Sequence, residues 1–182
     1  MTLQIGPRRG RAWEDVKTLD RMIRTARFAL TGKNEREFEL AFMSVLNAHV
    51  DNLNLKIHSQ LDKDTVVKSV YLFGKRHRPD ISLDEDGVAV EVKFLKSSTE
   101  GLKQAIGQSL FYRVRYRFVV NLIVVGEDKK ETYLKATNGE EKDMEEILGE
   151  MSSGFNVFTY VVPAFNPGPN IKAVLSYNNL EA

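Results

Sequence analysis

The stretch Arg78-Pro-Asp-Ile-Ser-Leu-Asp-Glu-Asp-Gly-Val-Ala-Val-Glu-Val-Lys93 decides the fold of this chain. Polar and apolar residues alternate on both sides of Asp84-Glu-Asp-Gly87, whose composition is typical of a turn, so the stretch predicts a β-hairpin. If the hairpin closes symmetrically, Asp80 faces Glu91 with the two Cβ atoms about 5 Å apart, and Lys93 shares their side. The opposite side is continuously apolar. One face is therefore expected to pack on a core, and the other can carry chemistry.

Asp80 and Glu91 would repel each other at this distance unless a divalent cation lay between them. Hard oxygen ligands favour Mg²⁺ or Mn²⁺, and Mg²⁺ keeps several waters and binds phosphate oxygens, which fits an open carboxylate pair. Lys93 would then contact an attacking water or the phosphate and stabilise the charge of a transition state. A surface cluster of ion pairs on an edge hairpin is the alternative, but it leaves the Pro79-Asp80 start of the strand unexplained.

Pro79-Asp80 followed by Glu91-Val92-Lys93 resembles the motif of the PD-(D/E)xK nuclease superfamily, which includes restriction endonucleases, archaeal Holliday-junction resolvases and RecB-type exonucleases. The resemblance covers about residues 33–126. It implies an α/β fold with a restriction-endonuclease-like core, in which helices flank a mixed central β-sheet. It also implies a Mg²⁺-dependent deoxyribonuclease, with Mn²⁺ as a substitute, that leaves a 5′ phosphate. Asp80, Glu91 and the Val92 carbonyl would hold the metal, and Lys93 would stabilise the attacking group.

A helix is predicted upstream, capped by Asn34 and continuing to about Val50. Its apolar positions recur at helical spacing and are Phe38, Phe42, Val45, Leu46 and His49. Glu35 projects inside this apolar arc, and Glu39 projects at its margin. The resemblance implies that this helix supplies one more acidic metal ligand, because residues 35–38 are similar to a Glu-Arg-Glu-Leu stretch of the archaeal resolvases. Glu35 is the first choice and Glu39 the substitute, although a first-turn glutamate can simply favour the helix dipole.

A second helix is predicted over residues 100–113, with Gln108 and Tyr112 one turn apart at the margin of its apolar face. Gln108-x-x-x-Tyr112 resembles the motif that follows the catalytic lysine in RecB-type nucleases. There the two residues contact the substrate backbone, and Gln104 is a further candidate on a nearby arc. In the alternative interpretation Tyr112 closes the core and Gln108 is solvated.

Further strands and a helix follow from the apolar patterns. The nearly unbroken apolar run Phe118–Val125 predicts a strand buried on both faces and parallel to the strand of Glu91. Residues 65–73 predict the strand that precedes Pro79-Asp80. Towards the C-terminus the patterns predict an acidic helix near residues 140–150, a strand near 155–162, a loop over 163–170 and a last strand within 171–176.

Charge is balanced overall but unevenly distributed along the 182 residues, whose formal net charge is +1. Residues 1–36 hold nine Lys or Arg against four Asp or Glu, whereas residues 127–182 hold five against ten. Such asymmetry indicates a side that faces a polyanion. Arg76, His77 and Arg78 lead directly into the candidate site and are the expected contacts to DNA phosphates. A solvated face is the alternative for each basic run.

The length fits one nuclease-like domain over residues 32–182, preceded by a basic helical extension over residues 1–31 that packs on the core, mediates a homodimer or rests on DNA. The chain has no cysteine, no signal peptide and no apolar stretch of membrane-spanning length, so we expect a soluble cytoplasmic protein without membrane contact. The expected function is DNA cleavage, as an endonuclease or an exonuclease. The alternatives are a nuclease-fold protein that binds DNA or a partner without cutting, and a nuclease subunit that needs a specificity partner.

Overall fold

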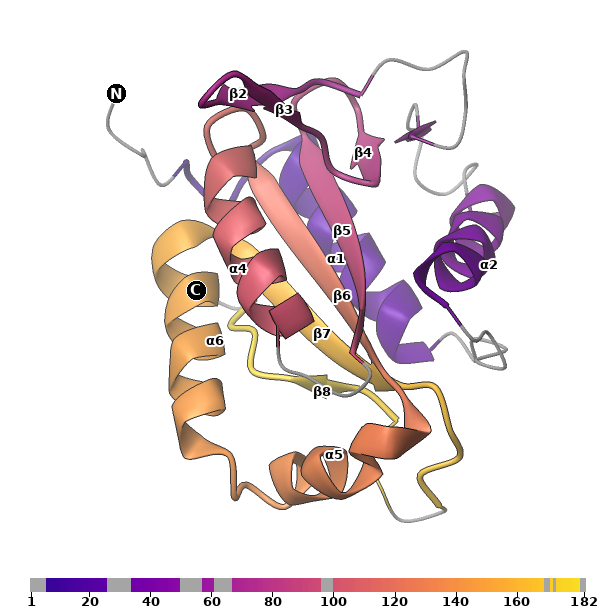
Figure 1. Cartoon of the computed structure of the whole chain (residues 1–182). Helices are drawn as coiled ribbons and strands as arrows, with labels where there is room; N and C mark the ends of the chain where they lie inside the picture. The colour runs from indigo at the N-terminus through magenta and orange to yellow at the C-terminus, as the bar shows by residue number, and fades with distance from the viewer. Residues whose placement is uncertain are drawn as a thin grey trace.

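Two long parallel strands, β5 (Val88–Leu95) and β6 (Phe118–Val125), form the centre of the fold. Every residue of β6 is buried, as expected for an apolar strand that is covered on both faces. The computed structural model describes residues 6–25, 34–49, 57–60, 67–95, 100–168, 171 and 173–180. Within these residues the central sheet has the order β1-β4-β5-β6-β7-β8 (Figure 1), completed by β1 (Ile57–Ser59), β4 (Ile81–Leu83), β7 (Val157–Pro163) and β8 (Leu175–Ser176).

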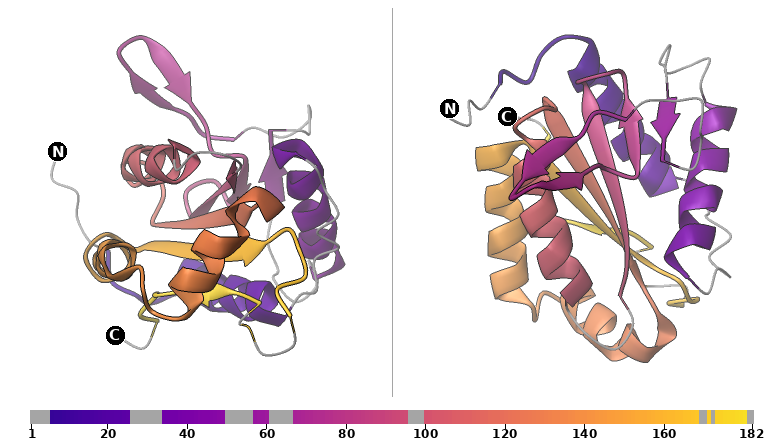
Figure 2. Two further views of the ribbon diagram at one scale, coloured as in Figure 1. Left: turned by 60° about the horizontal axis from the view of Figure 1, so that its bottom comes forward. Right: turned by 45° about the horizontal axis from the view of Figure 1, so that its top comes forward.

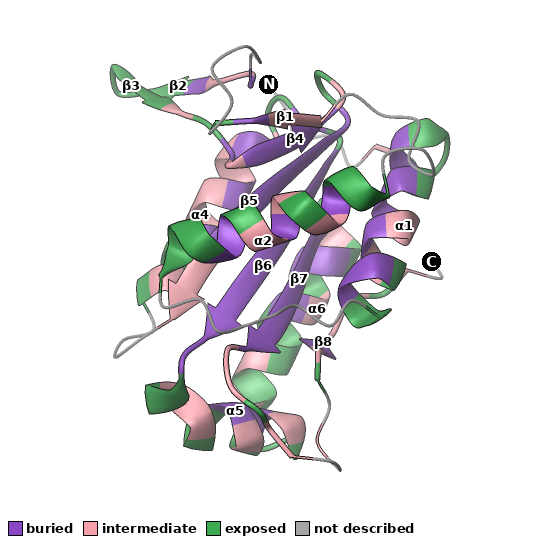
Figure 3. Cartoon of the chain, turned by 90° about the vertical axis from the view of Figure 1, so that its right-hand side faces the viewer, coloured by how far each residue is buried: buried purple, intermediate pink, exposed green. Residues whose placement is uncertain are grey.

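Helices cover both faces of this mixed sheet and give a single α/β domain (Figure 1). Helices α1 (Arg11–Thr25) and α2 (Glu35–Ala48) share the largest apolar core with one face of the strands. Helices α4 (Glu100–Tyr112) and α6 (Lys142–Phe155) pack on the other face. A 3₁₀ turn, η1 (Glu127–Lys129), and the short helix α5 (Lys130–Thr137) lie between β6 and α6. Figure 3 shows β5, β6 and β7 buried between helices whose outer faces are exposed.

The predicted hairpin of β4 and β5 is confirmed, and so is its register. Ile81 lies opposite Val90 and Leu83 lies opposite Val88 in antiparallel pairing. All four side chains are fully buried in the core that α1 and α2 cover. Because successive side chains of a strand point to opposite faces, this register turns Asp80 and Glu91 towards the other face, where α4 lies.

The predicted helices and the parallel strand around the hairpin are also confirmed. Helix α2 begins after Asn34, whose side chain accepts a hydrogen bond from the Glu37 amide at 3.0 Å. It ends at Ala48, and Val50 lies outside the described residues. Helix α1, from the predicted N-terminal extension, packs into the main core through Trp13 and its other apolar residues, whereas residues 1–5 and 26–31 of that extension lie outside the described residues.

The strand predicted over residues 65–73 is wrong in extent and in place. Residues 65 and 66 lie outside the described residues, and β2 (Val70–Leu72) pairs with β3 (Lys75–His77) in a separate two-stranded sheet. The cause is the turn Phe73-Gly74, which folds the chain back, since both residues have positive φ angles of 48° and 72°. The β2–β3 hairpin projects from the domain (Figure 2). The edge of β4 that does not pair with β5 pairs with β1, which the sequence pattern did not predict.

The C-terminal part follows the predicted order with shifted bounds. Helix α6 extends to Phe155, beyond the expected residue 150, and β7 therefore begins at Val157. Among the described residues of the expected last strand, Leu175–Ser176 is extended, and Lys172 lies outside the described residues. Helix α5 was not predicted. In the described part of the chain, no helix is long and apolar enough to cross a membrane.

Candidate active site

Two carboxylates are held by backbone amides along one edge of β5. Of the residues of β5, only Val88, Ala89 and Val90 pair with β4. From Glu91 to Leu95, that edge of β5 has no neighbouring strand among the described residues. The Val92 amide donates to Asp80 Oδ2 at 2.8 Å, and the Phe94 amide donates to Glu35 Oε2 at 3.2 Å. Since buried strand amides need acceptors, the uneven lengths of β4 and β5 fix Asp80 and Glu35 in place.

The Lys93 ammonium lies among these acidic groups. Its Nζ is 2.7 Å from Glu91 Oε1 and 3.3 Å from Glu35 Oε1. It also donates to the Val92 carbonyl at 3.2 Å. Three of the four groups that the sequence predicted as metal ligands are thus gathered around one positive charge, which is the chain's own lysine.

Tyr112 supports Glu91 from α4. Its side chain is fully buried, and its hydroxyl lies 3.0 Å from Glu91 Oε2 and 2.9 Å from the Arg78 carbonyl oxygen. Burial and the nearby Glu91 charge raise the pKa of Tyr112, so the hydroxyl stays a donor. Of the two roles left open for Tyr112, the structure places the side chain in the core, beneath Glu91, where solvent does not reach it.

The acidic groups of the site hold protons unusually strongly. Burial, reinforced by the Asp80 charge, raises the pKa of Glu91 to about 7. Burial also raises the pKa of Asp80, although Lys93 and the Val92 amide oppose the shift. Burial alone would lower the pKa of Lys93, but Glu91, Asp80 and Glu35 together raise it. The site therefore combines an ammonium that keeps its proton with two carboxylates of raised pKa.

The helical projection placed Glu35 inside the apolar arc and Glu39 at its margin, but in the structure Glu35 is exposed and Glu39 is buried. The Glu35 side chain is 46% exposed, whereas Glu39 is buried and its Oε1 has no hydrogen-bond partner among the described residues. Glu35 is the first residue of α2, where the helix layer ends and solvent enters, whereas Glu39 lies one turn further in. Burial, with the charges of Asp80 and Glu35, raises the pKa of Glu39 to about 7.

The basic run before Asp80 lies mainly on the β2–β3 hairpin. The Arg76 Nε donates to the Tyr71 hydroxyl at 2.9 Å, away from the carboxylates. His77 packs edge-on against Phe111 of α4, with ring centroids 5.5 Å apart. The Arg78 side chain is exposed, and only its carbonyl group meets the site, through Tyr112.

The two glutamines of α4 differ in burial. Gln108 Oε1 is buried one turn before Tyr112, without a hydrogen-bond partner in the described part of the chain. Gln104 is exposed one turn earlier. Gln108 is thus the glutamine that the helix directs inward with Tyr112, and Gln104 faces solvent.

Sequence reasoning missed Gln60, which follows β1 and positions the backbone around Asp80, and His58 of β1, whose ring nitrogens have no hydrogen-bond partner among the described residues. Gln60 Nε2 donates to the carbonyl groups of Arg78 and Pro79, each at 2.8 Å, and the Gln60 amide donates to the Asp80 carbonyl at 2.9 Å. His58 lies opposite Ser82 of β4, which gives it the same strand face as Asp80. A strand of three residues has no periodicity to read, so the sequence held no signal for either residue.

The donor set fits a hard divalent cation in its chemistry. Burial raises the pKa of Asp80, Glu91 and Glu39, and the Asp80 charge raises the pKa of the two glutamates further. Glu39 Oε1 is also a buried acceptor without a donor among the described residues. In the part of the chain that the structure describes, no three His, Cys, Asp or Glu side chains converge closely enough to form a metal site as they stand. The Lys93 ammonium is paired with Glu91 and with Glu35, so two carboxylates of the cluster are neutralised by the chain's own cation.

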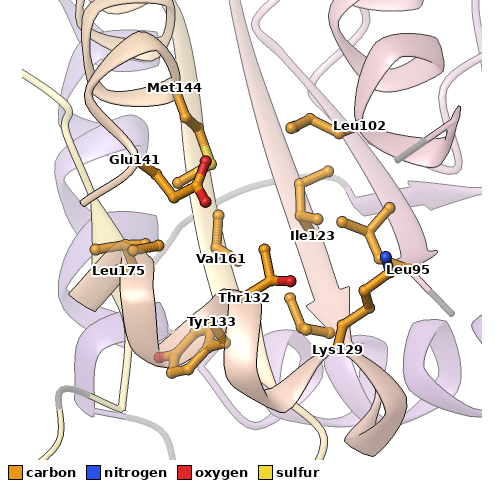
Figure 4. A pocket seen from close by; sticks show the side chains of 12 residues that line it. Leu95, Leu102, Ile123, Lys129, Thr132, Tyr133, Glu141, Met144, Val161 and Leu175 are labelled. Carbon is orange, nitrogen blue, oxygen red and sulfur yellow. The ribbon is translucent and has the colours of Figure 1, made fainter. Parts of the chain in front are cut away.

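An apolar pocket lies elsewhere, between β5, β6 and β7 and the helices α4, α5 and α6 (Figure 4). It holds about 150 Å³ and is lined by apolar residues such as Leu102, Ile123 and Met144, with Lys129, Thr132 and Glu141 as its polar members. Burial raises the pKa of the Tyr133 hydroxyl in this pocket, but the carboxylates of raised pKa, Asp80, Glu91 and Glu39, gather around Lys93, so the carboxylate cluster is the better candidate for chemistry.

Comparisons of this chain with protein-family models, curated proteins and solved structures gave no match.

The raised pKa values predict that the metal-free protein is less stable at higher pH. The folded state binds protons at Glu39 and Glu91 up to about pH 7, whereas the unfolded chain releases them near the ordinary value of 4.5. Their stabilising contribution is complete below the unfolded pKa and is lost as pH rises through 7. We therefore expect the melting temperature in chelator to be several degrees higher at about pH 5.5 than at about pH 8.

The variant Glu39→Gln shows how much of the pH dependence of the melting temperature comes from Glu39 and how much from acidic groups elsewhere. It should flatten the dependence of melting temperature on pH, whereas Glu150→Gln, an exposed change on α6, should leave the slope unchanged. Asp15, whose pKa burial raises to about 6, adds a slope of the same sign that both variants keep. Equal slopes in wild type and Glu39→Gln would contradict the proton affinity assigned to Glu39.

Tyr112 variants test the contact beneath Glu91. Tyr112→Phe removes the donor from a buried carboxylate and should cost about 1–3 kcal/mol of unfolding free energy, more at pH 8 than at pH 5.5. Tyr112→Ala also opens a cavity and should cost about 3–5 kcal/mol. Tyr116→Phe is the control, because that hydroxyl donates to the Lys68 carbonyl at 3.0 Å, so its cost should not vary with pH. A Tyr112→Phe protein that is as stable as wild type in denaturant titration would exclude the assigned contact.

Proposed function

We propose that the chain is a metal-dependent nuclease that hydrolyses phosphodiester bonds of DNA, and that its sheet and helices form a restriction-endonuclease-like core. One observation carries the proposal: on the β4–β5 hairpin, Lys93 is paired with Glu91 beside Asp80, and burial raises the pKa of both carboxylates. The order of elements agrees with it, because α2, the β4–β5 hairpin, α4 and the parallel strand β6 follow the order of the nuclease core that the motif resembles.

Asp80, Glu91 and the Val92 carbonyl are the groups that would hold Mg²⁺, with Glu35 and Glu39 as further acidic groups at the same place. A bound Mg²⁺ supplies charge neutralisation at a phosphate oxygen and lowers the pKa of its water ligands. Mn²⁺, which also prefers oxygen ligands, is expected to substitute.

The chain's own groups would divide the remaining work. Lys93 keeps its proton because three carboxylates raise its pKa, so it can donate to a non-bridging phosphate oxygen as negative charge develops there. Glu39, whose pKa burial raises to about 7, can take up or release a proton at neutral pH. A water oxygen attacks phosphorus, the P–O3′ bond breaks, and the products carry a 5′ phosphate and a 3′ hydroxyl.

Glu35 and Tyr112 would hold the acidic side chains in place before substrate binds. Glu35 is tied to the Phe94 amide and to Lys93, and Tyr112 is tied to Glu91, so both ends of the acidic cluster are held by hydrogen bonds. Preorganised charges of this kind lower the reorganisation needed at the moment of reaction. Arg76, His77 and Arg78 are proposed to contact DNA on the approach to the site.

A panel of labelled linear duplex, single-stranded, branched and supercoiled DNAs, incubated with Mg²⁺ or with chelator, tests this function. We expect cleavage of at least one substrate in Mg²⁺ and none in chelator. Glu91→Gln protein purified in the same way controls for contaminating nucleases and should be inactive. Wild-type protein that binds these DNAs but cuts none of them in Mg²⁺ or Mn²⁺ would favour the binding protein or the subunit that needs a partner.

A further inference from the structure

The tip of the β2–β3 hairpin presents an aromatic ring to solvent. Phe73 is 96% exposed, and it occupies the first position of a two-residue turn with a φ angle of 48°. Such turns favour Asn, Asp or Gly, because a positive φ brings a side chain into conflict with its own backbone. The Phe73 ring therefore stabilises neither the core nor the turn. Such a residue indicates a contact with another molecule.

The hairpin around Phe73 is basic as well as aromatic. Residues 67–79 hold four Lys or Arg and no Asp or Glu. Tyr71 is 62% exposed, and the Arg76 guanidinium lies over its ring at 5.3 Å from the centroid. Lys75 and Arg78 form no ion pair within the described residues. Two exposed rings on β2 and the turn, next to cations on and after β3, match the flat bases and the phosphates of a nucleic acid strand.

The base of the hairpin is fixed to the domain, although its tip projects (Figure 2). Val70 is buried in one apolar cluster with Ala89 and Tyr112, and the Tyr116 hydroxyl donates to the Lys68 carbonyl. His77 packs on Phe111 of α4. The ring at the tip is thus held in a defined direction relative to the carboxylates.

The hairpin also leads directly to the candidate site. Gly74 and Asp80 are separated by six residues, which span at most about 20 Å when extended. At 3.4 Å per stacked nucleotide this equals about six nucleotides. One strand of a nucleic acid can therefore reach the ring at the tip and the carboxylates at the same time.

We propose that the hairpin tip is a stacking site for an unpaired nucleobase, with Phe73 as the stacking ring and Lys75, Arg76 and Arg78 as the phosphate contacts. The bases of a duplex hide their faces from such a ring, whereas single strands, frayed ends and branch points offer them. The inference rests on the proposed function and names its substrate class: DNA with unpaired bases within about six nucleotides of the phosphate that is cut.

Binding measured in chelator tests the stacking site without requiring cleavage. The probes are a fluorescein-labelled single-stranded oligonucleotide and a blunt duplex of the same length, titrated by anisotropy. Phe73→Asn should weaken binding of the single strand by about five- to a hundredfold and binding of the duplex by less than about twofold. Phe73→Trp should keep the wild-type affinity, and Ile147→Asn, which removes an apolar residue that is 51% exposed on α6, is the control.

Asparagine suits the turn better than phenylalanine, so Phe73→Asn should melt no lower than wild type, and lost affinity cannot come from unfolding. The stacking site is refuted if wild type does not bind the single strand in chelator, if Phe73→Asn binds it like wild type, or if the variant loses single-strand and duplex binding equally. Ring-dependent binding by a protein that cuts no DNA would refute the nuclease and keep the stacking site. Cleavage that Phe73→Asn leaves unchanged, with unchanged single-strand affinity, would refute the stacking site alone.

Discussion

Lys93→Ala is expected to lower the rate of DNA cleavage by about a hundred- to a thousandfold, the effect of losing one charged donor to a developing oxyanion. The affinity for DNA should change by no more than about one phosphate contact, because the ammonium acts mainly on the transition state. Single-turnover rates at saturating protein, compared with dissociation constants from anisotropy, separate the two effects.

Lys103→Ala is the matched control for this variant. It removes the same charge from an exposed position on α4, so it should cut at the wild-type rate. Lys93→Ala should also lose more melting temperature between pH 5.5 and pH 8 than wild type does, because the carboxylates around the lost ammonium are then ionised without a partner. Equal cleavage rates for the two alanine variants would remove Lys93 from the mechanism.

Asp80→Asn is expected to abolish cleavage and to remove the rise in melting temperature that Mg²⁺ gives the wild-type protein. Asparagine keeps an oxygen acceptor for the Val92 amide but lacks the charge that a divalent cation requires. DNA affinity without metal should stay the same or increase, because a negative charge that faces phosphate is lost. Cleavage assays and thermal melts with and without Mg²⁺ measure both effects.

Asp84→Asn gives the comparison for Asp80→Asn within the same hairpin. Asp84 lies at the turn with a φ angle of 53°, which asparagine tolerates, and its carboxylate pairs with Arg11 at 3.7 Å. This variant should cleave DNA normally and keep the full response to Mg²⁺. An Asp80→Asn protein that behaves in the same way would show that the carboxylate of Asp80 does not hold the metal.

The hairpin could be predicted from sequence because its information is local. Alternation fixes which side chains share a face, and the opposition of Ile81 to Val90 follows from one short turn. The same locality predicted that Asp80, Glu91 and Lys93 share one face, and the ion pair between Lys93 and Glu91 agrees with this prediction. Strand β1 could not be predicted, because a strand of three residues is defined by its tertiary pairing with β4 and not by a pattern of its own.

Helix α2 shows what a helical projection cannot predict. The projection located the apolar arc of Phe38 and Phe42 correctly, but it contains no information on where the covering layer stops. For that reason Glu35 was expected to point coreward, although Glu39 is the buried carboxylate. The β2–β3 hairpin was not predicted, because the first residue of its turn is Phe73. At that position the usual turn residues are polar residues or glycine.

Cleavage in water enriched in ¹⁸O tests the central claim most directly, because it follows the oxygen that attacks phosphorus. The substrate that wild-type protein cuts best is digested in Mg²⁺, and the products are weighed by mass spectrometry. We predict one ¹⁸O atom on the 5′ phosphate of the product and a 3′ hydroxyl without label. Label on a 3′ phosphate, or the absence of any cleaved product in Mg²⁺, would contradict hydrolysis at the site of Asp80, Glu91 and Lys93.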